Sequence, residues 1–310
     1  MTIAIQPTRT RECHAKNKIN YRGIFIMIIE ITETEFHEVV QYCWEIAIDK
    51  TRYGFPRFAT FQDLSNRFMR TLRHDEDKIL AYYEDGSLCG VLNLFVENKE
   101  NYLQAIGGIF THANFEAVAT LFIAYLKSNY PGYEMNFGFP KEHVEANLYF
   151  NSIQAKPMDV SLTMKLMTED FSCKLIDNEV IQLDENHLDE YASFHDLHNP
   201  TMYWNGRRIS ENFDIWNIFF IKQDTQIIGS IFIQHSTNTE LEIFGVSINP
   251  DYKMHGLEEK LLRTALHYTL TPEIKEVFYF IDEDNQVEEA ITKKLGFKLI
   301  DTYRSYKLKI

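Results

Sequence analysis

A glycine and a basic residue stand between a strand pattern and a helix pattern in the second half of the chain. The segment reads Ile248-Asn-Pro-Asp-Tyr-Lys-Met-His-Gly-Leu-Glu-Glu-Lys-Leu-Leu262. A mostly apolar strand pattern occupies positions 241–248 before it, and apolar residues recur at helical spacing after it, beginning at Leu257. A strand, a glycine-containing loop and a helix start together aim free backbone N–H groups at an anion. The pattern therefore predicts a site for a phosphate-bearing group such as a pyrophosphate.

This segment resembles the acetyl-CoA motif of the GNAT superfamily of acyltransferases. The family pattern is an apolar residue, x-Pro-x-aromatic, Arg or Gln, Gly-x-Gly-x, and Gly or Ala. Met254 replaces the first glycine, and Glu258 replaces the last Gly or Ala, where the family holds the CoA pyrophosphate. An acid in a first helical turn is also favourable for the helix dipole, so Glu258 equally fits a helix that no longer binds CoA. The positions in register are Ile248, Pro250, Tyr252, Lys253, Gly256 and Leu257.

The resemblance implies that acetyl-CoA is the cosubstrate and that no metal takes part. It implies that backbone groups of Val246 and Ile248 hold the pantetheine arm. It also implies that N–H groups between Met254 and Glu258 hold the pyrophosphate, aided by Lys253. The cofactor-binding residues expected on this basis are Val246, Ile248, Lys253, Met254, His255, Gly256, Leu257, Glu258 and Asn285.

A second motif runs from Asn285 to Phe297, after an apolar strand pattern at 276–281. GNAT members often show an Asn, an amphipathic helix and then Gly-Phe at this spacing, with the helix beside the pantetheine arm. Gly296 also suits the left-handed exit of a helix. The two motifs stand in the expected order, and together the resemblance covers about residues 218–310.

Two catalytic positions follow from the resemblance. Many GNAT enzymes place a Tyr four residues before the Gly of Gly-Phe, where it protonates the leaving thiolate; here that position is Thr292, a poor acid. The attacking amine must also lose a proton to a base of suitable pKa or to a water chain. Glu242 is the candidate base and Glu240 the alternative. Both carboxylates equally fit solvent-facing strand positions, because a lone carboxylate signals little.

The same order of patterns occurs twice. Two strands around an Asp-containing turn occupy 79–90 and recur at 218–229, and the closing strand pattern at 159–166 recurs at 301–308. A repeat of about 140 residues suits a duplicated domain rather than a solenoid. Strands that alternate with helices and include hairpins indicate α/β layers around a mixed sheet. The predicted fold class is therefore α/β, an α+β mixed sheet, in two tandem domains, and the resemblance implies that these are GNAT-like acyl-CoA N-acyltransferase domains.

Three segments are expected along the chain. Residues 1–26 are basic and are predicted to be a disordered arm, with Met27 as an alternative start. Residues 27–167 are predicted to be a degenerate GNAT-like domain, because the loop at 111–115 has no glycine and no basic residue. Residues 168–310 are predicted to be the GNAT domain with the acetyl-CoA site. The first copy is then a structural or substrate-shaping partner.

The composition narrows the class of protein. The chain has 310 residues, 45% of them hydrophobic, and a net charge of −14. Such acidity disfavours nucleic-acid partners, and it argues against aminoacyl transfer from a charged tRNA. No apolar run approaches the roughly 20 residues of a membrane span. The four cysteines form no CxxC pair, which favours reduced thiols in a cytoplasmic protein.

The leading prediction is an N-acetyltransferase that moves an acetyl group from acetyl-CoA to the amine of a small molecule or peptide by direct attack. The acidic composition weakly favours such cationic acceptors. The alternative is a catalytically inactive GNAT-derived binding or sensor protein, which Glu258 and Thr292 favour. Neither nucleic acid nor a membrane is an expected partner, and a homodimer is left open.

Overall fold

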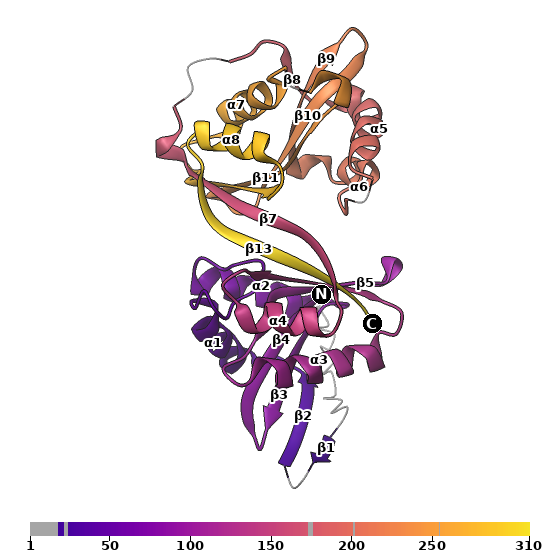
Figure 1. The fold of residues 1–310 in the computed structure, drawn as a ribbon, viewed down its shortest axis with the longest axis vertical. Helices are drawn as coiled ribbons and strands as arrows, with labels where there is room; N and C mark the ends of the chain where they lie inside the picture. The colour runs from indigo at the N-terminus through magenta and orange to yellow at the C-terminus, as the bar shows by residue number, and fades with distance from the viewer. Residues whose placement is uncertain (1–17, 22–23, 173–175, 201, 254) are drawn as a thin grey trace, which may run out of the picture. The chain divides into compact units, whose positions relative to one another are not determined.

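The chain folds into two compact units (Figure 1). The computed structural model describes residues 18–21, 24–172, 176–200, 202–253 and 255–310. Unit 1 comprises the chain up to Asp159 together with Tyr303–Ile310, and unit 2 comprises Val160–Thr302. The units therefore do not coincide with two consecutive halves of the sequence.

An exchange of closing strands explains this division. Strand β7 (Lys156–Met167) ends the first half of the sequence, yet it pairs antiparallel with β12 (Glu276–Asp282) of unit 2. Strand β13 (Lys298–Lys309) ends the chain, yet its last part pairs antiparallel with β6 (Glu134–Pro140) of unit 1. Each unit thus receives one strand that lies far away in sequence.

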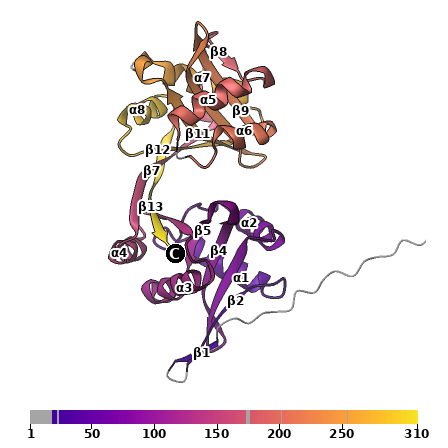
Figure 2. The same cartoon turned by 90° about the vertical axis from the view of Figure 1, so that its right-hand side faces the viewer.

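Unit 1 is a mixed sheet with helices on both faces (Figure 2). The strand order is β1-β2-β3-β4-β5-β6-β13, and only β5 and β6 are parallel neighbours. Helices α3 and α4 pack on one face, and α1 and α2 pack on the other. Besides β6 and β13, its elements are β1 (Lys18–Tyr21), β2 (Ile24–Glu30), α1 (Phe36–Ala47), α2 (Phe61–Arg73), β3 (Lys78–Glu84), β4 (Ser87–Glu97), a 3-10 turn (Asn98–Glu100), β5 (Tyr102–Phe110), α3 (Phe115–Asn129) and α4 (Val144–Ser152).

Unit 2 repeats this order of elements. Its strand order is β7-β12-β11-β10-β9-β8, and only β11 and β12 are parallel neighbours. Helices α7 and α8 cover one face, and α5 and α6 cover the other (Figure 1). Besides β7 and β12, its elements are β8 (Val180–Gln182), α5 (Leu188–His198), α6 (Gly206–Glu211), β9 (Trp216–Gln223), β10 (Gln226–His235), β11 (Glu240–Ile248), α7 (Leu257–Thr269), α8 (Gln286–Lys294) and 3-10 turns at Thr168–Asp170, Glu185–His187, Phe213–Ile215 and Pro250–Tyr252.

The predicted mixed α/β fold with a repeated unit is confirmed. The turn residue Asp85 between β3 and β4 has a φ of 48°, and Asp224 between β9 and β10 has a φ of 53°. Both hairpins thus turn through a left-handed aspartate at the position where the sequence repeats, which is a conformation that Asp tolerates better than most residues.

The predicted disordered arm over residues 1–26 is wrong for its last part. Lys18–Tyr21 forms β1, which pairs antiparallel with β2, and β2 already begins at Ile24. The physical reason is that the apolar run after Gly23 continues the strand pattern upstream of Met27. The rest of the predicted arm lies outside the described residues.

No helix among the described residues is long and apolar enough to cross a membrane. No cluster of three or more potential metal ligands occurs in the described part of the chain. Cys43 is buried and Cys89 is partly exposed, both as free thiols. Cys13 and Cys173 lie outside the described residues.

Candidate functional site

Strands β11 and β12 of unit 2 are paired over only part of their length. Their parallel register joins residues 240–243 with residues 276–279. Strand β11 nevertheless continues to Ile248, and its other edge stays paired with β10 up to that residue. Among the described residues, positions 244–248 therefore have no strand partner on the edge that faces β12.

A β-bulge explains why β11 leaves β12 at this point. Phe232 of β10 lies opposite Gly245, whereas the next residue, Ile233, lies opposite Ile243. Phe244 is therefore the extra residue of β11. A bulge bends its strand and increases the local twist, so the strand turns away where the pairing with β12 ends.

The backbone groups of Val246 and Ile248 face the open edge. The N–H of Asn249 bonds to the carbonyl of Ile228 in β10 at 2.9 Å, and backbone groups alternate between the two edges of a strand. Residues 246 and 248 therefore turn theirs away from β10. Consistent with this, the Val246 N–H is directed at the phenol oxygen of Tyr279 in β12, where it favours the charged form of the phenol. The two positions expected to hold a pantetheine arm thus share one edge.

Helix α7 begins without a side-chain cap. Its N-cap is Gly256, which has a left-handed φ of 73°, and an added Cβ there would meet no atom within 4 Å. Lys253, His255 and Gly256 are all exposed in the loop before the helix. An uncapped N-terminus with open space in front of it leaves its N–H groups available to an anion. The predicted contact at Met254 lies outside the described residues.

Leu257 and Glu258 form the first turn of this helix. Leu257 is buried in the core of unit 2, so it fixes the turn, while Glu258 is half-buried. Arg263 and Lys294 both pair with Glu259 instead. Among the described residues no cation pairs with Glu258, so its negative charge stays uncompensated at the helix start.

Tyr279 and Glu288 meet beside the open edge, and sequence reasoning did not single them out. The Tyr279 hydroxyl donates to a carboxyl oxygen of Glu288, and both residues are buried. Burial raises the pKa of Glu288 to about 7, although the bond from Tyr279 opposes this; the negative charges of Asp282 and Glu258 raise it further. Burial also raises the pKa of Tyr279. The sequence signal was ambiguous, because Asn-x-x-Glu at a helix start indicates an ordinary cap.

Asn285 lies at the start of α8, and both ends of its side chain are used there. Its Oδ1 accepts the Glu288 N–H at 3.2 Å, and its Nδ2 donates to Glu288 Oε2 at 2.7 Å. Thr292 is fully buried, and its hydroxyl donates to the Glu289 carbonyl at 2.9 Å. The structure therefore places Asn285 as a holder of Glu288 and keeps the Thr292 proton within α8.

Glu242 lies on the face of the sheet opposite to α7. Its neighbours Leu241 and Ile243 point into the core under α7, and side chains alternate along a strand. Directly across from Glu242 lie Gln234 of β10 and Phe278 of β12. The Glu242 carboxylate therefore lies near the end of the segment over which β11 and β12 are paired.

Aromatic side chains gather next to Glu242 on this face. Trp216 of β9 lies across from Gln234, so it shares the row of Glu242. Its ring contacts Phe244 at 5.0 Å, Trp204 at 5.1 Å and Phe232 at 5.4 Å between centroids. The bulge residue Phe244 therefore carries this aromatic cluster up to the point where β11 bends.

The apolar surroundings change the pKa of the Glu242 carboxyl. Burial raises its pKa to about 7, while a bond from the Ser236 hydroxyl at 3.3 Å favours the charged form. A group with a pKa near the working pH is suited to proton transfer. Glu240, the alternative base, lies at the end of the β10–β11 hairpin, where its carbonyl accepts the Ser236 N–H at 3.1 Å.

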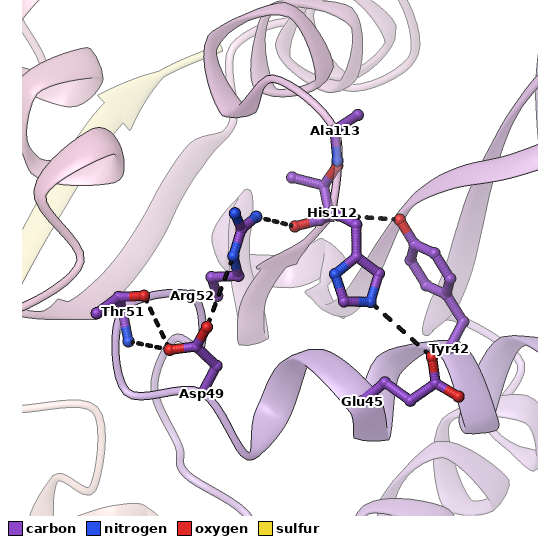
Figure 3. Close-up of polar contacts among 8 residues, drawn as sticks. Tyr42, Glu45, Asp49, Thr51, Arg52, His112 and Ala113 are labelled. Carbon is purple, nitrogen blue, oxygen red and sulfur yellow. Dashed lines mark hydrogen bonds and ion pairs between the residues drawn. The ribbon is translucent and has the colours of Figure 1, made fainter.

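The equivalent loop of unit 1 is occupied by its own side chains (Figure 3). The His112 N–H donates to the Tyr42 hydroxyl at 3.2 Å, and Arg52 donates to the Thr111 carbonyl at 3.2 Å. The Ala113 N–H donates to the Thr111 hydroxyl at 3.0 Å. The loop before α3 thus has internal partners where the loop before α7 is open.

Acidic side chains lie beside Arg52 and His112. Asp49 lies 3.6 Å from the Arg52 guanidinium, and Glu45 lies 4.0 Å from the His112 ring (Figure 3). Asn114 caps α3 by accepting the Ala117 N–H at 2.9 Å. Helix α3 is therefore a capped helix, unlike α7.

Unit 1 also closes its own strand opening. Strands β5 and β6 are paired only at residues 102–104. Gly107 accepts the Gly54 N–H and donates to the Phe55 carbonyl, both at 2.9 Å, and the Phe55 N–H bonds to Gly138 at 2.8 Å. A chain segment thus bridges β5 and β6 beyond their pairing, at the position that corresponds to the open edge of β11 in unit 2.

Comparison with known proteins agrees with this difference between the units. A domain model described as "Acetyltransferase (GNAT) domain" matches residues 169–298. A mycothiol acetyltransferase from Corynebacterium glutamicum (strain R) is 28% identical over 91 residues, which are 29% of this chain and 31% of that protein. The chain thus matches less than a third of the length of this relative.

Solved structures resemble the chain over nearly all of its length. A GNAT N-acetyltransferase from Sphaerobacter thermophilus has a TM-score of 0.64 at 12% identity, covering 92% of this chain and 95% of that one. A tandem GNAT protein from the clavulanic acid biosynthesis pathway has a TM-score of 0.62 at 10% identity, covering 92% and 98%. The chain therefore has the tandem GNAT fold, and the region that matches a GNAT acetyltransferase domain lies in its second half.

Proposed function

We propose that unit 2 transfers an acetyl group from acetyl-CoA to the amine of a small molecule or peptide. The observation that carries the proposal is the coincidence of three features on adjacent elements. Strand β11 has an open edge beyond residue 243, α7 has an uncapped N-terminus, and Glu242 has a pKa of about 7. Unit 1 bridges the corresponding edge and caps the corresponding helix, so it is the structural partner.

The backbone groups of unit 2 have a geometry that fits acetyl-CoA. The backbone groups of Val246 and Ile248 would bind the pantetheine amides along the open edge. N–H groups at 255–258 would bind the pyrophosphate, and Lys253 would add a positive charge. Acetyl-CoA supplies the activated acyl thioester. Glu258 opposes this fit by its charge, which lowers the expected affinity without blocking the backbone contacts.

Glu242 is the proposed base for the acceptor amine. Its carboxylate stands on the face opposite to α7, at the end of the β11–β12 pairing, and would take the proton that the amine loses as it attacks. Gln234 and the aromatic cluster around Trp216 border the same position. Because Glu242 has a pKa of about 7, a large fraction is ionised at neutral pH.

The alternative function is a binding or sensor protein without catalysis. It is supported by the uncompensated charge of Glu258 and by Thr292, whose hydroxyl is used within α8. Such a protein would bind the coenzyme and would release no thiol when amines are added.

Calorimetric titration with acetyl-CoA tests the proposal. Gly256→Asp should weaken binding at least tenfold, because it adds bulk and negative charge where phosphate must approach the backbone. Gly132→Asp is the matched control in unit 1, since Gly132 also has a positive φ and open space around its Cβ. The affinity of Gly132→Asp for acetyl-CoA should equal that of the wild type. If the wild-type protein binds no acetyl-CoA, the proposed function is wrong.

A further inference from the structure

Unit 2 contains a buried proton-bearing pair that has no part in the function proposed so far. Tyr279 is 1% exposed and Glu288 is 8% exposed. The Tyr279 hydroxyl donates to Glu288 Oε1, and the second carboxyl oxygen accepts from Asn285 at 2.7 Å. Burying an ionisable carboxyl is costly unless its partners compensate it, so this pair calls for an explanation beyond packing.

Elsewhere in the chain, a neutral side chain accepts the hydrogen bond of a buried tyrosine hydroxyl. In unit 1 the hydroxyl of the buried Tyr306 donates to Asn147 Oδ1 at 2.8 Å. That bond satisfies the phenol without a group that must lose its solvation when charged. The carboxyl of Glu288 therefore offers something that an amide would not, namely a transferable proton near neutral pH.

The location of the pair connects it with the open edge. Tyr279 is the last residue of β12 that pairs with β11, across from Ile243. The N–H of Val246 faces the open edge and is directed at the Tyr279 phenol oxygen. The hydroxyl therefore stands at the inner end of the opening, where β11 and β12 part.

The charges around Glu288 keep it protonated to a higher pH than an ordinary carboxyl. Burial is the main cause, and the carboxylates of Asp282 and Glu258 act in the same direction. The bond from the Tyr279 hydroxyl opposes them. Asn285 fixes the orientation of the carboxyl by donating from its Nδ2 to Oε2, while its Oδ1 accepts the backbone N–H of Glu288.

We propose that Tyr279 and Glu288 form a relay that delivers a proton to the sulfur of departing coenzyme A. The inference rests on the proposed acetyl transfer. As the amine nitrogen forms its bond to the acyl carbon, the carbon–sulfur bond breaks and its electron pair goes to sulfur. The Tyr279 hydroxyl turns from Glu288 to that sulfur and gives its proton to it. The protonated carboxyl of Glu288 then donates its own proton to the phenolate oxygen of Tyr279. The amine proton goes to Glu242, which later passes it to solvent, and Glu288 regains a proton from solvent, so no net proton is released.

This relay supplies the general acid that Thr292 does not provide. The helix position that resembles the general-acid position of many relatives carries a hydroxyl that is already bonded within α8. Tyr279 brings a phenol to the open edge from the neighbouring strand instead. Tyr279 is then the group that touches the reacting sulfur, and Glu288 acts through it.

The test is a pH titration of coenzyme A bound to the full chain, followed by the ultraviolet absorbance of its thiolate. The Tyr279 hydroxyl should stabilise the bound thiolate, so Tyr279→Phe should raise the pKa of the bound thiol by about one unit, a tenfold drop in thiolate at a given pH. Calorimetry should show acetyl-CoA affinity unchanged within about threefold. Tyr306→Phe is the matched control and should change neither quantity.

A second variant covers the case in which Tyr279→Phe does not fold. Glu288→Gln keeps an acceptor for the Tyr279 hydroxyl but cannot ionise. The wild-type thiol should titrate over a broad range, because it is coupled to Glu288. In Glu288→Gln it should titrate as a single group.

The outcomes separate the two proposals. If both variants bind coenzyme A and the thiol titrates as in the wild type, the relay is wrong while the proposed function stands. If Tyr279→Phe binds acetyl-CoA much more tightly and leaves the thiol pKa unchanged, the hydroxyl merely obstructs the edge and the relay is wrong. If the wild-type protein binds neither compound, both proposals are overturned.

Discussion

The N–H of Gly54 donates to the carbonyl of Gly107 at 2.9 Å, and this bond begins the bridge across the strand opening of unit 1. Gly54 leaves no space for a side chain, since an added Cβ would lie 2.5 Å from the Gly108 Cα. Gly54→Ala should therefore lower the free energy of unfolding by about 1–3 kcal/mol. Denaturant unfolding measures the loss. Acetyl-CoA affinity of the same variant should be unchanged, and a large loss of affinity would place the coenzyme in unit 1 instead.

Glu258→Ala should tighten acetyl-CoA binding by about tenfold. The uncompensated carboxylate approaches the expected pyrophosphate, and such a contact costs on the order of 1–4 kcal/mol, depending on the local dielectric. Glu116→Ala is the matched control, because Glu116 occupies the first turn of α3 in unit 1. Calorimetry compares the three proteins. Equal affinities for wild type and Glu258→Ala would show that the carboxylate turns away from the coenzyme.

Glu242 should set the pH dependence of acetyl transfer. Its pKa is about 7, and a base acts only when deprotonated, so the rate should rise with pH through about 7 and level off above. Glu242→Gln should lower the rate by roughly 10²–10⁴-fold. Release of coenzyme A thiol with a panel of amines measures the rate. Glu240→Gln is the control, and a larger loss in that variant would exchange the roles of the two carboxylates.

Glu288 should make the free energy of unfolding fall as the pH rises. Its pKa in the folded protein is about 7, above the value of 4.5 of an exposed glutamate. Between these values the folded state binds more protons than the unfolded state, so stability is lost as pH increases through this window. The loss attributable to Glu288 is on the order of 2–3 kcal/mol.

Glu288→Gln should remove that part of the slope. Denaturant midpoints of wild type and variant between about pH 4.5 and 7.5 provide the comparison. Glu242→Gln serves as the parallel variant, because Glu242 also has a raised pKa. Identical slopes for Glu288→Gln and the wild type would mean that Glu288 is ionised normally in the folded protein.

The sequence by itself determined the repeated order of elements and the strand-loop-helix segment at 248–262. These features depend on the spacing of nearby residues, such as the apolar series that begins at Leu257 or the turns at Asp85 and Asp224. Local periodicity encodes them directly, because a helix or hairpin is built from residues a few positions apart. The position of Gly256 at a helix start follows from the same local pattern.

Only the tertiary structure decided which strands complete each sheet and what occupies each strand opening. The exchange of β7 and β13 joins segments that lie more than a hundred residues apart, and each strand alone has the pattern of any closing strand. Likewise, Gly54 meets Gly107, and Tyr279 meets Glu288, through pairings between different elements. Neither partner carries a signal for the other in its own neighbourhood. The raised pKa of Glu242 has the same origin, since burial is a property of the packed sheet and not of the strand pattern.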